Sequence, residues 1–206
     1  TEIYTLSLHD ALPICSYAAL YYSWLLVRDP IGTDGQIVRA IPSCGHIAGA
    51  MARTDITIGV HQAAANIVLR WLVGLTHEVT GPEQGIFNPE HINVLRSFAG
   101  RNIRIYGART LSSDSSLRYV NVRRTLLMLK RAFRMSLQWV PFEPHTFYTR
   151  ELARLALSSF LAALRQRGGL AGNTPEESFF VQCDDENNPP DAVDAGQMRI
   201  DVGVAI

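Results

Sequence analysis

The stretch "INVLRSFAGRNIRIYGART", residues 92–110, carries the clearest strand signal in the sequence. Ile103 and Ile105 alternate with the polar residues Asn102 and Arg104, a pattern typical of a strand with one buried face. Gly100 divides the stretch near its middle. We therefore expect two strands here, one on each side of Gly100.

Two long helices are expected after these strands. The first, at about 118–138, has apolar residues at helical spacing: Tyr119, Val122, Leu126, Leu129, Phe133 and Leu137. Its opposite face is basic, and we interpret it as either a solvated or a partner-binding surface: Arg123, Arg124, Lys130, Arg131 and Arg134. The second, at about 149–167, ends at Gly168-Gly169 and is expected to bury these residues: Leu152, Leu155, Ala156, Phe160 and Leu164.

Shorter elements are expected on both sides of this region. "AALYYSWLLV" (18–27) and "QIVRAIPS" (36–43) indicate strands joined by a turn, and "HIAGAMART" (46–54) a short helix. "WLVGLTHEVT" (71–80) indicates a strand, and in the connector at 81–92 Asn88-Pro89 is expected to open a short helix. The last strands are "ESFFVQC" (177–183) and "QMRIDVGVAI" (197–206). The predicted fold class is α+β, with a mixed β-sheet packed against the two long helices.

The first fourteen residues, "TEIYTLSLHDALPI", match the conceptual translation of a common short-read sequencing adapter. They lack the basic start and continuous apolar core of a signal peptide, and Pro13 interrupts any helix. We interpret residues 1–14 as an artefact and not a domain, and expect them to make few contacts. Residues 15–206 are then one domain, which we expect to be truncated at both ends.

Composition excludes several classes of protein. The three cysteines (Cys15, Cys44 and Cys183) are far apart and form no CxxC pair, so the sequence predicts neither a disulfide scaffold nor a zinc ribbon. The longest apolar run, residues 18–27, is about half as long as a membrane-spanning helix requires. We therefore expect no membrane insertion.

The charges are unevenly distributed, although the net charge is zero. Residues 96–167 contain fourteen Lys and Arg against three acids, a balance of +11. Residues 174–201 contain eight acids against Arg199, a balance of −7. Such a chain suits head-to-tail binding of its own copies, whereas the basic segment alone would also suit nucleic acid.

Candidate catalytic and metal-binding groups are sparse. Cys44 and His46 lack an orienting acid in the sequence. His77 and Glu78 are expected on opposite faces of a strand, which disfavours a shared metal. The oxygen-rich segment 184–188 lacks the spacing and the glycine of a calcium-binding loop, so a solvated loop is favoured. We predict no enzyme, no cofactor and no metal.

Six stretches resemble, in order and spacing, the C-terminal part of contractile tail sheath proteins, which occur in phages, tailocins and related injection particles. The first three are "AALYYSWLLVRDP" (18–30), "GHIAGAMARTDITIGVHQAAAN" (45–66) and "QGIFNPEHINVLRSFAGRNIRIYGARTLSSD" (84–114). The others are "RYVNVRRTLLMLKRAF" (118–133), "QWVPFEP" (138–144) and "GNTPEESFFVQCDDENNPPDAVDAGQMRIDVGVA" (172–205). The resemblance covers residues 15–206 almost without a gap.

This resemblance implies a structural subunit that polymerises around an inner tail tube and contracts to drive the tube through a cell envelope. It implies these partners: other copies of the chain, the tube protein, and baseplate and tail terminator proteins. It also implies a place in the phage tail of the virion, after assembly in the host cytoplasm. A nucleic-acid-binding module built on residues 96–167 is the alternative, and an enzyme would need a polar pocket.

The resemblance also implies that several polar residues make structural contacts or contacts between subunits. Arg53 and Asp55 are expected to be connectors, buried or facing an interface, because a guanidinium and a carboxylate can hold several backbone segments. Arg109 and Asp114 are interpreted in the same way. The complete set of candidates is Arg53, Thr54, Asp55, Asn66, Arg109, Asp114, Arg123, Arg124, Asp184, Glu186 and Asp194.

Overall fold

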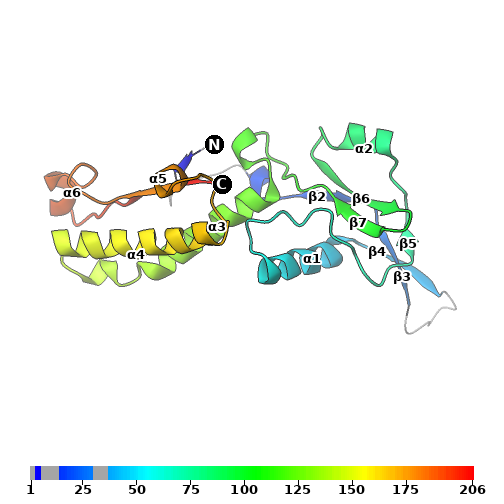
Figure 1. Cartoon of the computed structure of the whole chain (residues 1–206), viewed down its shortest axis with the longest axis horizontal. Coiled ribbons are helices and arrows are strands. Elements are labelled where there is room, and N and C mark those ends of the chain that lie inside the picture. The colour runs from blue at the N-terminus through cyan, green and yellow to red at the C-terminus, as the bar shows by residue number, and fades with distance from the viewer. Residues whose placement is uncertain (1–2, 6–13, 30–36) are drawn as a thin grey trace. The chain divides into compact units, whose positions relative to one another are not determined.

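The computed structural model describes residues 3–5, 14–29 and 37–206 (Figure 1). The chain divides into two compact units, and the division falls within one helix, between Arg123 and Arg124. The first unit contains the described residues from 14 to 123, and the second contains residues 3–5 and 124–206. Strands and helices occur in both units, which confirms the α+β class, but the single sheet expected from the sequence is three separate sheets.

The first unit holds two of these sheets. In chain order its described elements are η1 (Ile14–Tyr17), β2 (Leu20–Tyr22), β3 (Leu25–Arg28), β4 (Val38–Ile41), α1 (Cys44–Thr57), β5 (Gly74–Leu75), α2 (Gly81–Phe87), β6 (Ile92–Phe98), β7 (Asn102–Tyr106), η2 (Ser115–Leu117) and the start of α3 (Val120–Ser136). One sheet has the order β4-β3-β5 and is antiparallel. The other has the order β2-β6-β7, with β2 parallel to β6, and is therefore mixed.

The strand expected at 18–27 is two strands that belong to different sheets. β3 pairs with β4 as predicted, with Leu25 opposite Ile41, while the turn expected between them lies largely outside the described residues. The break occurs at Ser23, whose φ is +82°. The Ser23 hydroxyl donates to the His77 carbonyl at 3.0 Å and accepts from the His77 N–H at 3.2 Å. These side-chain bonds replace ladder bonds at the break.

The predictions for residues 71–92 were partly wrong. Only Gly74 and Leu75 pair as a strand, and Trp71 has a φ of +64°. Helix α2 begins at Gly81 and ends at Phe87, so it precedes Asn88-Pro89 instead of following it. Thr80 and Glu83 form a capping box at its start, and the Thr80 backbone N–H and hydroxyl hold the pKa of Glu83 below its ordinary value.

The strands on either side of Gly100 are confirmed. β6 and β7 pair antiparallel from Val94 opposite Tyr106 to Phe98 opposite Asn102, and Gly100 has a φ of +71°. Helix α1 is also confirmed, and it contributes to the core of this unit. That core consists of Leu25, Ile47, Ala50, Leu69, Leu75, Leu95, Ile103 and Ile105.

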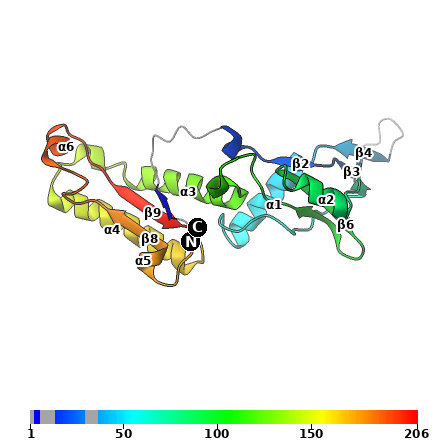
Figure 2. The same cartoon turned by 90° about the horizontal axis from the view of Figure 1, so that it is seen from above.

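The second unit combines the third sheet with the two long helices. Its described elements are β1 (Ile3–Thr5), the rest of α3, η3 (Val140–Phe142), α4 (Phe147–Gln166), α5 (Pro175–Ser178), β8 (Phe179–Gln182), α6 (Pro190–Asp194) and β9 (Asp201–Ala205). The sheet has the order β1-β9-β8 and is antiparallel, so β9 is central. Figures 1 and 2 show β8 and β9 running alongside α4.

Residues 3–5 pair with Gly203–Ala205 as an edge strand. The other residues of the adapter-like string that the structure describes are limited to Ile14 in η1. The remaining positions of 1–14 lie outside the described residues. The interpretation of this string as an artefact therefore stays a prediction.

The predicted buried face was correct for most of α3 and wrong for α4. Val122, Leu126, Leu129 and Phe133 are buried, but Tyr119 is exposed. In α4 the buried positions are Thr149, Arg150, Ala153, Leu157 and Leu161, whereas Leu152 and Leu155 are exposed. Leucine and alanine occur all round this helix, so their spacing alone does not select one face.

Candidate functional site

Arg53 and Thr54 tie the end of α1 to its surroundings through backbone carbonyls. Arg53 Nη2 donates to the Val68 carbonyl at 3.2 Å. Thr54 is buried, its hydroxyl donates to the Ala50 carbonyl at 2.9 Å, and its own carbonyl accepts from Ile58 and Gly59 at the helix end. Arg53 was expected to be either buried or facing a subunit interface. It is exposed, which leaves only the interface-facing position.

Arg53 and Asp55 lie close together near the end of α1. They are two positions apart on α1, and residues at that spacing do not face each other on a helix. Asp55 is half-buried. Arg53 contacts the segment that follows the alanine run, and a second arginine also binds that segment.

The second contact to this segment comes from Arg104, which sequence reasoning missed. Arg104 Nη1 donates to the Asn66 carbonyl at 2.8 Å and to Asn66 Oδ1 at 3.1 Å. Asn66 has a φ of +58°, and its N–H donates to the Ile105 carbonyl at 2.7 Å. Two arginines therefore fix residues 66–68 against α1 and β7. Among the candidate residues, Arg53 and Asn66 thus both take part in holding the segment 66–68.

Arg109 and Asp114, interpreted as a similar pair, act separately. Arg109 Nη1 donates to the Asn88 carbonyl at 2.8 Å. Asp114 Oδ1 accepts from the Ser116 N–H at 2.9 Å and caps η2. Asn93, which is fully buried and was not singled out from the sequence, bonds to the Arg109 backbone in both directions.

Arg123 departs most from the basic face, solvated or partner-binding, that was expected on α3. It is 2% exposed, and its Nε, Nη1 and Nη2 atoms have no hydrogen-bond partner. Its guanidinium carbon lies 3.9 Å from the centroid of the Tyr17 ring, a cation–π contact. Arg124 is half-buried, whereas Arg131 and Arg134 are exposed.

The acidic candidates lie in the second unit, in the segment that leads from β8 through α6 to β9. Asp184 Oδ1 accepts from the Glu186 N–H at 3.0 Å, and Glu186 Oε2 accepts from Gln182 Nε2 at 3.0 Å. Asn188 is buried beneath them and bonds to the Arg199 N–H and carbonyl at 2.7 and 2.9 Å. Asp194 is exposed at the end of α6.

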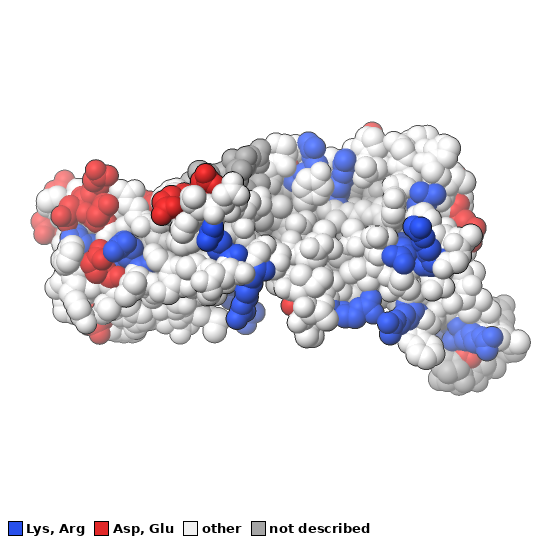
Figure 3. Space-filling view, in the orientation of Figure 1, with Lys and Arg blue, Asp and Glu red and all other residues white. Residues whose placement is uncertain are grey.

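This ordered acidic segment forms a distinct surface. Figure 3 shows acidic side chains gathered over the α6 end of the second unit. One of them, Asp185, pairs with Arg150 at 2.6 Å. Cys183, buried behind the segment, has a raised pKa because burial disfavours its thiolate.

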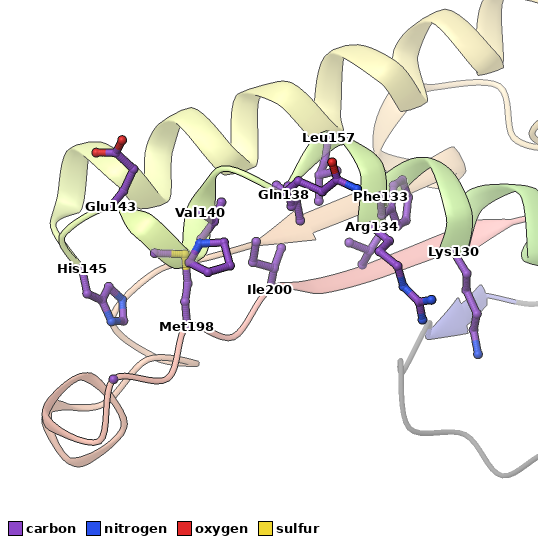
Figure 4. A pocket seen from close by; sticks show the side chains of 14 residues that line it. Lys130, Phe133, Arg134, Gln138, Val140, Glu143, His145, Leu157, Met198 and Ile200 are labelled. Atoms are coloured by element: carbon purple, nitrogen blue, oxygen red, sulfur yellow. The ribbon is translucent and has the colours of Figure 1, made fainter.

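A groove of about 620 Å³ lies beside α3 and η3 in the same unit (Figure 4). Most of its lining is apolar: Phe133, Leu137, Val140, Leu157, Met198 and Ile200. Lys130 and Arg134 lie at one end, where Figure 4 shows both side chains extending in the same direction. His145 lies at the other end, and neither of its ring nitrogens has a hydrogen-bond partner.

Within residues 3–5, 14–29 and 37–206, no group of three or more His, Cys, Asp or Glu side chains could hold a metal ion. In the same residues, no helix is both long enough and apolar enough to span a membrane. Arg53 and Arg109 each donate to a backbone carbonyl, an arrangement that joins segments of the chain.

Comparison with known proteins gives one consistent family. A family model described as the phage tail sheath protein central domain matches residues 15–111, whereas the resemblance seen in the sequence is to the C-terminal part of sheath proteins over residues 15–206. The tail sheath protein of Salmonella phage ViI is 25% identical over 191 residues, which are 89% of this chain and 28% of that protein.

Solved structures extend the likeness to almost the whole chain. The baseplate of the anti-feeding prophage contains a chain that is 34% identical, with a TM-score of 0.85, over 92% of this chain and 51% of that one. The contracted sheath of the extracellular contractile injection system PVC contains one that is 36% identical, with a TM-score of 0.84, over 92% and 52%. The chain thus spans about half the length of these structures. These matches make the chain similar, over almost its whole length, to proteins of contractile tail sheaths and of a baseplate.

Proposed function

We propose that this chain is part of the subunit of a contractile sheath. In this proposal the subunits pack as a helical cylinder around an inner tail tube, and the cylinder contracts to drive the tube through a target envelope. The observation that carries the proposal is the match over 92% of the chain, at 36% identity, to the PVC sheath complex in its contracted state.

The work of contraction comes from new contacts between subunits and needs no nucleotide in this proposal. The polar candidate residues join backbone segments and provide no catalytic group, which supports a mechanical role. Regions with charge balances of +11 and −7 supply complementary surfaces for repacking between copies.

Neighbouring subunits are joined by strand addition at the β1-β9-β8 sheet. Its β1 edge is occupied over only three residues, Ile3–Thr5, opposite Gly203–Ala205. Extended backbone can pair along such an edge, so an arm from another subunit can add a strand there. If residues 1–14 are an artefact, as we propose, the natural arm differs from the segment that now pairs with β9.

The further partners in the proposal are an inner tail tube protein, the baseplate and a tail terminator protein. A chain similar to this one was solved within the baseplate of the anti-feeding prophage, which supports the second of these. The particle is a virion tail or a related injection device assembled in the bacterial cytoplasm. The nucleic-acid alternative is set aside because the relatives named above are sheath and baseplate proteins.

The experiment grafts the terminal arms of the PVC sheath protein onto residues 15–206 and examines the product by negative-stain electron microscopy. We expect long tubes with arms and none without them, and fewer tubes at high salt because charged surfaces are screened. Arms that carry proline at alternate positions are the matched control, since proline removes ladder donors. Failure of the grafted protein to polymerise would contradict the proposal, and tubes from residues 15–206 alone would contradict the strand-addition step.

A further inference from the structure

The groove beside α3 and η3 has two properties of a surface that another molecule covers. Its lining residues Phe133, Leu137 and Met198 are apolar, yet the groove is open. Both ring nitrogens of His145 are buried without a partner at one end of it. Apolar surface exposed to water and buried polar atoms without a hydrogen bond both raise the free energy of the protein. A bound partner would lower it in both cases.

The basic end of the groove selects the charge of that partner. Lys130 and Arg134 are one helical turn apart on α3, and both line the groove. Arg134 is exposed, and within the part of the chain that the structure describes no carboxylate pairs with it. Two cations beside an apolar trench match a segment that carries two acids next to apolar residues.

Helix α6 is such a segment. Asp191 and Asp194 are three positions apart and therefore lie on one face of the helix. Both are exposed, and neither side chain pairs with a cation among the described residues. Pro190 and Val193 provide apolar surface next to them. Asn188, bonded to the Arg199 backbone, holds this segment in a fixed shape.

We propose that the groove of one copy receives α6 of a second copy, with Asp191 and Asp194 against Lys130 and Arg134. Within one copy no ion pair connects Asp191 or Asp194 to Arg134 in the described residues, so Arg134 and these two acids remain available for a neighbour. A contact of this kind is heterologous, since the two copies use different surfaces, and it therefore repeats from copy to copy. The inference rests on the proposed function because it assumes that copies meet.

The test places a photo-crosslinking amino acid at Gln138, an exposed position that lines the groove. Copies that carry it are mixed with isotopically labelled copies of the whole chain, irradiated at low salt, and analysed by mass spectrometry. We expect crosslinks between copies to residues 189–198. Arg134→Glu in the crosslinker copy, or Asp194→Arg in its partner, should each lower the yield about tenfold.

Charge exchange makes the test specific. A crosslinker copy with Arg134→Glu mixed with a partner copy with Asp194→Arg should recover the crosslink, since the attraction is restored with reversed sign. Arg131→Glu, on the same helix outside the groove, and Glu176→Arg, an acid on α5, are the controls and should leave the yield unchanged.

Crosslinks to another segment, no crosslinks between copies, or equal losses in the control variants would each overturn the inference. So would a failure of the exchanged pair to recover the yield. The outcome does not depend on the grafting experiment, because the crosslinking test uses the chain without grafted arms and without a tail tube. Tubes without this crosslink would contradict only the groove contact, and the crosslink without tubes would contradict only the sheath proposal.

Discussion

Asn93 bonds to the backbone of Arg109 as a neighbouring strand would. Asn93 Oδ1 accepts from the Arg109 N–H at 2.7 Å, and Asn93 Nδ2 donates to the Arg109 carbonyl at 2.8 Å. The same Nδ2 also donates to the Leu20 carbonyl at 3.0 Å. One buried carboxamide thus joins β6 to the chain that leaves β7 and to β2.

Replacing Asn93 with Ala should destabilise the first unit by about 3 kcal/mol, since three backbone groups then lose the buried carboxamide that is their partner. Urea unfolding followed by circular dichroism measures the change. Asn173→Ala is the control, because Asn173 is exposed, and should alter the free energy of unfolding by less than about 0.5 kcal/mol. A loss at Asn93 no larger than the control's would contradict this account of the site.

Gly107 and Gly85 should respond to alanine with opposite signs. A Cβ at Gly107 would lie 2.6 Å from Asn93 Oδ1 and 3.0 Å from Asn93 Cα, so Gly107→Ala should destabilise the protein by about 2 kcal/mol. At Gly85, inside α2, no atom lies within 4 Å of the added Cβ. Gly85→Ala should therefore stabilise the protein by about 0.5–1 kcal/mol, measured by the same urea unfolding.

The contact of Arg123 with Tyr17 can be measured by a double-mutant cycle. Tyr17→Leu in the natural background removes the ring beneath a buried guanidinium and should destabilise the protein. In an Arg123→Met background the same change should cost about 1–2 kcal/mol less, which is the size of a desolvated cation–π contact. Equal costs in both backgrounds would show that the ring contributes only its own packing.

Cys44 and Cys183 should differ strongly in thiol reactivity. Cys44 is exposed, whereas Cys183 is 1% exposed and its pKa is raised by burial. In a Cys15→Ser variant at pH 8, one thiol should react rapidly with Ellman's reagent and the other only after urea is added. Cys44→Ser should remove the rapid phase. Two rapid phases in the folded protein would contradict the burial of Cys183.

Arg53→Ala and Asp55→Ala should impair sheath assembly in a protein that has its terminal arms. Arg53 is exposed and makes one bond to the Val68 carbonyl, so its loss should cost no more than about 1 kcal/mol of folding stability. Tube yield by negative-stain microscopy, with unfolding measured in parallel, separates the two effects. A hydrolytic or transfer activity that disappears with these changes would contradict the mechanical role.

The sequence predicted elements whose signal is local. β6 and β7 followed from alternation around Gly100, and α3 followed from four buried residues at helical spacing. Thr80 and Glu83 have the spacing of a capping box, a local signal for the start of α2 that sequence reasoning missed when it placed the helix start at Asn88-Pro89. The break at Ser23 depends on His77, which lies 54 residues away, and no local pattern indicates it.

The sequence indicated which residues make the candidate contacts, but it did not indicate the groups to which they bond. Arg53 and Arg109 were singled out, yet both donate to backbone carbonyls, which every residue carries and no sequence pattern marks. Arg123 was assigned to a basic face, either solvated or partner-binding, whereas it is buried without an acid, which is rare for arginine. The groove was missed since α3, η3 and the segment before β9 contribute to it from distant parts of the chain.

The central position of β9 sets an order of events during synthesis. β8 has no strand partner among the described residues until residues 201–205 have left the ribosome, whereas all strands of the first unit are available once residue 106 has emerged. Domains complete themselves from the N-terminal side as translation proceeds. The unit of residues 14–123 can therefore fold while the chain is still being made, and the sheet of β8 and β9 forms only after translation has passed residue 205.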